Sequence, residues 1–421
     1  MTLFDESFDT LWEQWAEEAE RQAASRLREA DRIAERNQWK VIRAFQKRKV
    51  SDFHFAASTG YGYNDRGRET LDEVYADVFG AEAAIVRPHL VSGTHAIATA
   101  LFGVLRPGDE LVFVTGRPYD TLRKVIGRPG DGTGSLADWG IRSVEVPLAA
   151  DGRVDYGAVA AAVSERTKAF AIQRSRGYEW RPSFTVAEIG DMARALKEMK
   201  PDSVLFVDNC YGEFTEEREP TEAGADLIAG SLIKNPGGGL APSGGYIAGR
   251  RDLVERAAQR LTAPGIGGEV GAMLGTTRAI FQGLFLAPLL VSQAVKGSIF
   301  AAALFERLGF ETHPKWNDPR TDLIQAIRFG SPEPLVAFVQ AIQQAAAVDA
   351  HVVPEPWDMP GYEHPVIMAA GTFIQGGSLE LSADAPIREP YIAYMQGGLT
   401  YAHVKMAVRQ ALTALRERGF L

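Results

Sequence analysis

The chain has 421 residues, of which 46% are hydrophobic and 24% charged, which is ordinary for a globular protein of more than one domain. Its net charge of −9 excludes a global basic field, so we expect neither nucleic acid nor a membrane as a partner. The single cysteine, Cys210, excludes an intrachain disulfide, and with no signal-peptide pattern and no apolar run of about 20 residues it favours a cytoplasmic location.

Residues 9–49 contain no glycine or proline and are rich in alanine, glutamate and arginine. Apolar residues recur there at helical spacing, which predicts one long amphipathic helix or two. We therefore expect residues 1–55 to form an N-terminal helical arm that packs on the body of the protein or on another subunit.

From about residue 80, short β-rich runs alternate with helical stretches. The runs are residues 84–90, 111–115, 143–148, 169–174, 204–209, 226–232 and 245–250. Several are unbroken apolar segments, typical of strands buried on both faces, and their alternation with helices predicts a mostly parallel sheet. After about residue 290 a helical stretch leads into a second region that ends in a helix near 400–419. We expect a large α/β domain over residues 56–290 and a small domain over 291–421.

Three residues mark a possible anion site. Ser92, Gly93 and Thr94 follow an expected strand and open an expected helix. The free N–H groups at a helix N-terminus, with small hydroxyl side chains, suit a phosphate. The alternative is that Ser92 is an ordinary helix N-cap.

Asp208 ends the apolar run VLFVD, where open α/β sheets place their ligands. Burying a carboxylate there is unfavourable by several kcal/mol unless it has a cationic partner or a strong donor. A protonated pyridine nitrogen would be such a partner. The alternative is that Asp208 caps the next turn.

Lys234 is the only charged residue in the stretch 230–249, which holds seven of the 42 glycines. Apolar surroundings predict a lowered pKa and hence a nucleophilic amine that can form a Schiff base. The alternative is a partly buried lysine whose ammonium reaches solvent. Ser231 could reach the phosphate held near residue 92, and the glycines at 237–239 and 244–245 would let backbone approach a flat ligand.

Together these features describe a planar pyridine aldehyde that carries a phosphate, which is pyridoxal 5'-phosphate (PLP). Rival motifs are absent from the sequence. No GK[ST] ends the glycine-rich stretch, no GxGxxG follows the first strand, and no HExxH occurs, so we expect no metal site.

From about residue 55 onward the sequence resembles the fold-type I PLP enzymes. Within them it resembles the cystathionine synthase/lyase and methionine γ-lyase group, and most closely the branch named methionine γ-lyase family or aluminium resistance protein. The resemblance rests on SGTHAIATALFGVLRPGDEL, GYGYNDRGRETL, IQRSRGYEWRPS and ADAPIREPYIAYMQGGLTY. It implies an aspartate-aminotransferase-like α/β fold, with a mostly parallel seven-stranded sheet in the large domain and a smaller α+β C-terminal domain.

The resemblance also implies roles for single residues. Gly93 and Thr94 would hold the phosphate through backbone amides, and Ser231 would be a further phosphate ligand. Tyr119 would stack on the cofactor, Asp208 would pair with the pyridine nitrogen, and Lys234 would form the internal aldimine.

The sequence departs from the family at the segment that reaches a neighbouring subunit's phosphate. Tyr63 fits the family pattern, but Asp65 stands where the arginine is expected. Arg66 or Arg68 could substitute for it. Ile233 also replaces a threonine just before the lysine.

A second departure concerns the substrate. Glu380 stands where the family has the arginine that grips the substrate carboxylate. We expect Arg388 to replace it, because a carboxylate prefers a bidentate guanidinium. Arg174 and Arg176 are rivals, while Tyr178 and Trp180 could line the pocket.

These residues predict a PLP-dependent carbon–sulfur lyase that performs β- or γ-elimination on a sulfur-containing or related amino acid. Lys234 would be the base at Cα, and Tyr63 or Tyr119 would protonate the leaving group. The alternatives are an aminotransferase, a decarboxylase, or a non-catalytic PLP-fold protein with a stress or metal-resistance role. The family further implies a homodimer or homotetramer with shared active sites, to which Tyr63 and Arg66 would come from the neighbour.

Overall fold

The computed structural model describes residues 6–359 and 362–421, which cluster into two compact units. The larger unit comprises residues 36–177 and 181–287, and the smaller comprises residues up to 35, 178–180 and 288–421. Helix α1 (Glu6–Lys47) is a single helix, which decides between the one helix and the two that the sequence allowed.

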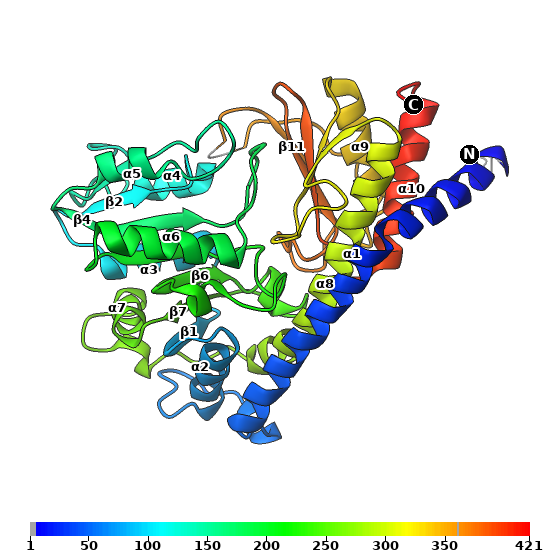
Figure 1. Ribbon diagram of the computed structural model, residues 1–421. Helices are drawn as coiled ribbons and strands as arrows, with labels where there is room; N and C mark the ends of the chain where they lie inside the picture. Colours follow the sequence, from blue (N-terminus) through cyan, green and yellow to red (C-terminus); the bar gives the residue numbers. More distant parts are fainter. Residues whose placement is uncertain (1–5, 360–361) are drawn as a thin grey trace. The chain divides into compact units, whose positions relative to one another are not determined.

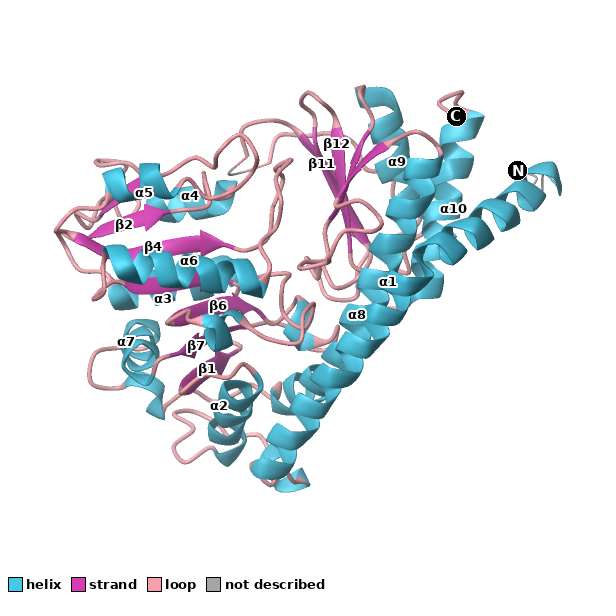
Figure 2. Ribbon diagram, viewed as in Figure 1, coloured by secondary structure: helices cyan, strands magenta, loops and turns pink. Residues whose placement is uncertain are grey.

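The larger unit is built on a seven-stranded sheet (Figures 1 and 2). Its strands are β1 (Ala83–Arg87), β2 (Glu110–Phe113), β3 (Arg142–Glu145), β4 (Thr167–Gln173), β5 (Val204–Asp208), β6 (Leu227–Ser231) and β7 (Gly245–Gly249). The order is β1-β7-β6-β5-β4-β2-β3. Strand β7 runs antiparallel to both of its neighbours, β1 and β6, and all other neighbouring pairs are parallel. This confirms the mostly parallel seven-stranded sheet predicted from the sequence.

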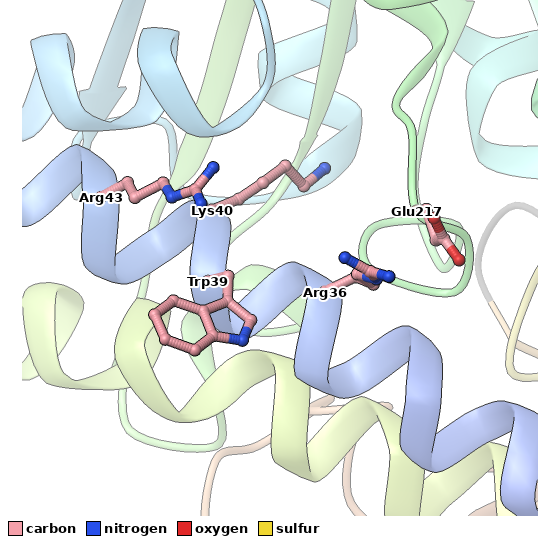
Figure 3. Close-up of a pocket in the computed structure, with 5 residues that line it drawn as sticks. All are labelled: Arg36, Trp39, Lys40, Arg43 and Glu217. Atoms are coloured by element: carbon pink, nitrogen blue, oxygen red, sulfur yellow. The ribbon is translucent and has the colours of Figure 1, made fainter.

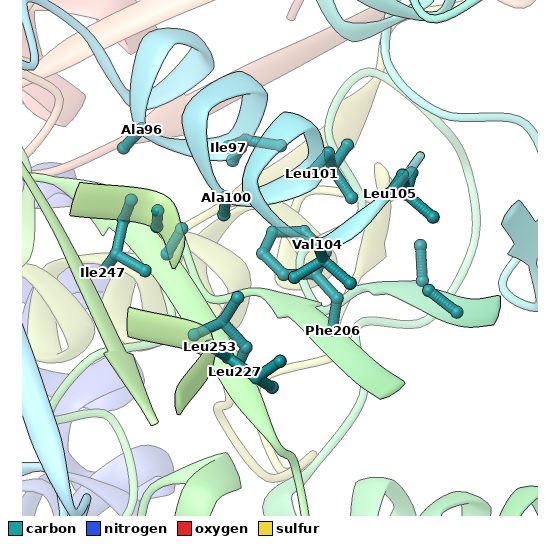
Figure 4. Close-up of a cluster of buried hydrophobic side chains, with 14 of the residues drawn as sticks. Ala96, Ile97, Ala100, Leu101, Val104, Leu105, Phe206, Leu227, Ile247 and Leu253 are labelled. Atoms are coloured by element: carbon teal, nitrogen blue, oxygen red, sulfur yellow. The ribbon is translucent and has the colours of Figure 1, made fainter. Parts of the chain in front are cut away.

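Helices connect and cover these strands. They are α2 (Arg66–Val78), α3 (Gly93–Val104), α4 (Asp120–Ile126), α5 (Tyr156–Ala162), α6 (Val186–Met199) and α7 (Arg251–Leu261), with short 3-10 turns at Asp52–Phe55, Pro220–Ala223, Asn235–Gly237 and Gly267–Glu269. Helices α3 and α7 pack on each other and on the sheet (Figure 4). Ile97, Leu101 and Val104 of α3 face Leu227 and Ile247 of the strands in one buried apolar cluster.

The sheet topology determines which polar residues meet. Strands β4, β5 and β6 run parallel, so their carboxyl ends lie at one edge of the sheet. Gln173 is in register with Asp208, and Ser231 ends the next strand. The candidate polar residues therefore gather where parallel sheets bind ligands.

The smaller unit contains a five-stranded antiparallel sheet in the order β10-β11-β12-β9-β8. Its elements are β8 (Glu311–His313), β9 (Gln325–Arg328), α9 (Pro332–Gln344), β10 (Val366–Ala369), β11 (Ser382–Pro386), β12 (Ile392–Gln396) and α10 (Tyr401–Glu417). This confirms the smaller α+β region. The first part of α1 packs within this unit, since Trp12 meets Phe300 edge-on and Glu20 accepts from Tyr401 and Lys405.

Helix α8 (Thr277–Arg307) is 31 residues long and apolar enough to cross a membrane by length and composition. Two thirds of its most apolar window, 67%, is buried inside the protein. A core helix passes the same test, and this burial is typical of a core helix.

The glycines around Lys234 pack against backbone rather than against open space. A Cβ at Gly238 would lie 2.1 Å from the Gly283 carbonyl oxygen, and one at Gly244 would lie 2.9 Å from the Arg87 carbonyl oxygen. The expectation that these glycines admit a flat ligand is therefore wrong for Gly238 and Gly244. They let the loop after β6 lie directly on α8 and on the end of β1.

Gly283→Ala should destabilise the fold although alanine favours helices. A Cβ at Gly283 would lie 2.1 Å from the Gly237 carbonyl oxygen, so backbone must move. We expect the free energy of unfolding in urea to fall by about 2 kcal/mol. Gly190→Ala on α6 is the control, because its Cβ would meet only ordinary contacts at 3.5 Å. Equal stability of the two variants would contradict the close packing.

Candidate active site

Asp208 is the last residue of β5 and its side chain is buried. Its Oδ1 accepts a hydrogen bond of 3.1 Å from the Cys210 N–H. Burial raises the pKa of Asp208, while the positive charge of Lys234 and the Cys210 donor oppose that rise. A buried carboxyl in this setting is stabilised as the anion by a further cationic partner.

Lys234 follows β6 and lies beside the same strand end. Its Nζ sits 3.8 Å from the centroid of the Tyr211 ring, a cation–π contact. Burial acts to lower the pKa of Lys234, but the Coulombic influence of Cys210, Tyr211, Asp208 and Tyr119 outweighs it and raises that pKa. The expectation of a lowered pKa is therefore wrong for the chain by itself, because acidic groups from other segments surround the amine.

The predicted anion site lies at the N-terminus of α3. Ser92 is its N-cap, and its Oγ accepts from the His95 N–H at 3.0 Å, so its hydroxyl has the ordinary capping role. A Cβ at Gly93 would lie 3.2 Å from both the Cys210 Sγ and the Ser231 Cβ. The start of α3 therefore packs against both the loop that follows Asp208 and the end of β6 at Ser231.

Ser231 carries the clearest sign of a ligand. Its side chain is buried, and within the described residues its Oγ has no hydrogen-bond partner. An unpaired buried hydroxyl is unfavourable by about 1–3 kcal/mol, so a ligand oxygen at this point would satisfy it. The donor set of a helix N-terminus and a buried hydroxyl fits a phosphate.

Tyr119 contacts the N-terminal turn of α3 and lies within the electrostatic influence of Lys234. Its hydroxyl lies 3.2 Å from the Thr94 Oγ1, and its N–H donates to the Gln173 Oε1 at 3.0 Å. Burial, followed by the charge of Asp208, raises the pKa of Tyr119. The phenol therefore keeps its proton at neutral pH, the form that can donate a hydrogen bond, and its role as proton donor to the leaving group stays a prediction.

These residues fit PLP. The buried carboxyl of Asp208 suits its ring nitrogen, the amine of Lys234 suits its aldehyde, and Ser231 with the α3 N-terminus suits its phosphate. Within residues 6–359 and 362–421, no group of three His, Cys, Asp or Glu side chains gathers as a metal ion would need.

Three residues at this site were missed by the sequence reasoning. Tyr211 holds Lys234 by its ring and has a positive φ of 71°, a strained backbone of the kind that clusters at functional sites. Gln173 positions Tyr119, and its place at the end of β4 beside Asp208 could have indicated this. The Asn235 Nδ2 donates to the carbonyls of Tyr211 and Glu213, each at 2.9 Å, which fixes that loop beside the lysine.

The segment expected to reach a neighbouring subunit is partly exposed. Tyr63 is 64% exposed and stacks on Tyr61 with ring centroids 5.3 Å apart. Asp65 caps α2 by accepting from the Arg68 N–H, which explains its presence. Arg68 is buried and donates to the carbonyls of Gly62, Gly271 and Glu269, so it cannot substitute for the family arginine. Arg66 is exposed and remains the candidate.

Arg174 is not placed to bind substrate. Its side chain is fully buried and pairs with Glu216 at 2.8 Å and Glu219 at 3.6 Å. It also donates to the Asn209 Oδ1 at 2.8 Å. The prediction of substrate binding by Arg174 is therefore wrong, since these partners already use its guanidinium. Arg176 is likewise buried.

Arg388 and Tyr178, the other two predicted substrate residues, line one cavity of about 220 Å³ in the smaller unit. Arg388 donates to the Tyr178 carbonyl at 3.0 Å and pairs with Glu179 at 3.2 Å. The Tyr178 hydroxyl donates to Asp384 at 2.8 Å. Trp180 lines the same cavity and also lies under the Arg328 guanidinium. The structure thus brings together residues more than 200 positions apart.

Glu380 occupies the family position of the substrate-binding arginine and has a different task. Its side chain is buried and accepts from the N–H groups of Phe373 and Ile374, each at 2.8 Å. Glu380 therefore anchors the loop before it and offers no positive charge.

Comparison with known proteins identifies the family and the fold of this chain. A family model described as methionine gamma-lyase matches residues 12–416. A Listeria innocua protein proposed to be a cystathionine beta-lyase involved in aluminum resistance is 58% identical, with TM-score 0.93 over 95% of this chain and 98% of that chain. A carbon-sulfur lyase involved in aluminum resistance from Clostridium novyi is 47% identical, with TM-score 0.93 over 96% of each chain.

A more distant structure concerns the fold alone. The pyridoxal-5'-phosphate dependent protein YhfS of Escherichia coli is 18% identical, with TM-score 0.60 over 90% of this chain and 96% of that chain. Together these matches confirm the predicted resemblance and the fold-type I architecture. They also confirm, at the level of the family, the prediction of a PLP-dependent lyase.

A second buried acidic residue, Glu213, lies within the electrostatic influence of Lys234. Glu213 is fully buried, and its Oε1 accepts from the Tyr246 hydroxyl at 2.8 Å. Burial raises the pKa of Glu213 to about 8. The carboxyl is therefore neutral at pH 7, although the unfolded chain would ionise it near its ordinary value of 4.5.

This difference predicts a pH-dependent stability. Because the folded protein binds more protons than the unfolded chain between about pH 4.5 and 8, this group lowers stability as pH rises, by up to about 1.4 kcal/mol per pH unit. Glu213→Gln should remove this contribution to the pH dependence of the free energy of unfolding. The variant should therefore become more stable relative to the wild type as the pH rises toward 8. Urea unfolding at pH 5.5, 7 and 8.5 measures it, with the exposed Glu255→Gln as control. An unchanged slope in Glu213→Gln would show that the carboxyl is ionised when folded.

Proposed function

We propose that this chain, which belongs to the methionine gamma-lyase family, is a PLP-dependent carbon–sulfur lyase that acts on a sulfur-containing amino acid. One water would be consumed, and the products would be a thiol or hydrogen sulfide, ammonia and a keto acid. The observation that carries the proposal is the meeting of Lys234, buried Asp208 and the unpaired Ser231 hydroxyl at one sheet edge. The carbon–sulfur lyase names of the two similar proteins support the reaction class.

Within this proposal the chain holds PLP with Lys234, Asp208, Ser231 and the α3 N-terminus. Bound PLP supplies an electron sink for negative charge that develops at the substrate Cα. The Lys234 Nζ accepts the Cα proton, and only the neutral amine can do so. A cationic partner that takes the Asp208 carboxylate removes one of the groups that raise the pKa of Lys234.

The substrate carboxylate is assigned to Arg388. Its guanidinium lines the 220 Å³ cavity and is anchored to the Tyr178 carbonyl, which orients it. Glu179 pairs with it at 3.2 Å and is 60% exposed, so an incoming carboxylate can displace it at little energetic cost. A guanidinium can donate two parallel hydrogen bonds to a carboxylate, which the ammonium group of a lysine cannot do.

We also propose a cytoplasmic homodimer or homotetramer whose active sites are shared between subunits. The exposed stack of Tyr61 and Tyr63, with the exposed Leu274, supports a contact surface on the larger unit. Tyr63 and Arg66 would reach the phosphate of the neighbouring subunit. Small amino acids are the only other partners that the proposal requires.

The reaction class is tested on the purified protein supplied with PLP. Cystathionine, methionine and cysteine should yield a keto acid and ammonia in equal amounts for at least one of them. Lys234→Ala should reduce the rate at least 1,000-fold, because base and covalent anchor are lost together. Borohydride treatment followed by peptide mapping should place the cofactor mass on Lys234.

Other products would overturn this reading in distinct ways. A new amino acid would indicate an aminotransferase, and carbon dioxide a decarboxylase. No turnover and no cofactor after reconstitution would indicate a binding protein, as would a Lys234→Ala variant that retains the biological role.

Arg388→Ala should raise KM at least tenfold with a smaller change in kcat, because the carboxylate contact is made in the bound substrate and in the transition state alike. Arg388→Lys should recover little of the loss. The matched control is Arg328→Ala, which removes another guanidinium of the smaller unit that lies over Trp180. If both alanine variants behave alike, packing rather than carboxylate binding explains the effect.

A further inference from the structure

The last turns of helix α1 and the two residues that follow it carry only positive charge. Residues 36–49 contain six basic residues and no acidic one. Lys47 and Arg48 pair with Asp77. Arg36, Lys40 and Arg43 lie on successive turns of the helix, where like charges at this spacing repel one another.

These three cations line a pocket of about 360 Å³ (Figure 3). Trp39 and Glu217 complete the lining. Three cations and one carboxylate leave the lining with a net charge of +2. Within the described part of the chain, neither Arg36 nor Arg43 has an ion-pair partner.

The pocket has a fixed wall. Asn37 is fully buried, and its Nδ2 donates to the carbonyls of Phe214 at 3.1 Å and Glu216 at 2.9 Å. These two bonds hold the loop that carries Glu217 against α1. The spacing between the helix cations and the loop is therefore set by the fold.

The ammonium group of Lys40 also lacks a hydrogen-bond acceptor among the described residues. Its Nζ is buried and, among the described residues, makes no hydrogen bond. Its ion-pair partner Glu222 lies 3.8 Å away, which is beyond hydrogen-bond distance. A buried ammonium is stabilised by an acceptor, and an anion in the pocket would provide one.

We propose that this pocket binds a nucleotide. Arg36, Lys40 and Arg43 would bind its phosphates. Each guanidinium can donate two parallel hydrogen bonds to a phosphate group, and the Lys40 ammonium adds a positive charge. Trp39 is 53% exposed and offers a flat face on which a base stacks. The volume of about 360 Å³ lies in the range of small-molecule sites.

Calorimetric titration of the PLP-loaded protein at low salt tests the proposal, since PLP blocks the other phosphate site. ATP and pyrophosphate are expected to bind, and adenosine much more weakly. Arg36→Ala/Arg43→Ala should weaken both phosphate ligands at least tenfold. Trp39→Ala should weaken ATP several-fold and leave pyrophosphate almost unchanged, since only ATP carries a ring.

Arg21→Ala/Arg28→Ala is the matched control, because it removes two exposed charges from the same helix outside the pocket. Its affinities should equal those of the wild type. Equal weakening in the control would reduce the binding to general charge attraction and overturn the proposal. So would the absence of ATP binding. A change of oligomer mass in Arg36→Ala/Arg43→Ala, with ATP affinity unaltered, would assign the pocket to a contact with a second copy instead.

Discussion

A lysine amine and a carboxyl group lie close together at the carboxyl edge of a parallel sheet, away from bulk water. Burial of either charge alone is unfavourable by several kcal/mol, so each needs partners. Lys234 has the Tyr211 ring and the negative field of Asp208, and Asp208 has Lys234 and the Cys210 N–H. The surrounding architecture of the larger unit keeps these few contacts in place.

That architecture relies on close backbone packing. Gly238 and Gly283 allow the loop after β6 to lie directly on α8, and Asn235 ties the same loop to residues 211 and 213. The loop that carries the lysine is thus fixed by the Asn235 hydrogen bonds and by glycines that permit close backbone contact. The positive φ of Tyr211 is tolerated because these contacts hold the loop on both sides.

Much of the larger unit could be predicted because its signals are local. Unbroken apolar runs indicated buried parallel strands, and Ser92 before an apolar helix indicated a cap. The direction of the Lys234 pKa could not be predicted, because Cys210, Tyr211 and Tyr119 come from segments distant in sequence. Arg174 was misassigned for the same reason, since Glu216 and Glu219 are more than 40 residues away.

Arg388 became a candidate because the sequence departs from its family at Glu380, and no pattern in the residues predicted its contact with the Tyr178 carbonyl. Yet Glu380 gives a physical reason why an arginine is needed elsewhere. Its carboxylate is committed to the N–H groups of Phe373 and Ile374, so an arginine at position 380 would leave both partly buried donors without this partner. Restoring the family arginine there would disrupt the loop. A guanidinium for a carboxylate ligand would therefore have to come from a different segment. The proposed candidate is Arg388, which is held by a backbone carbonyl and by an exposed carboxylate that a ligand can displace.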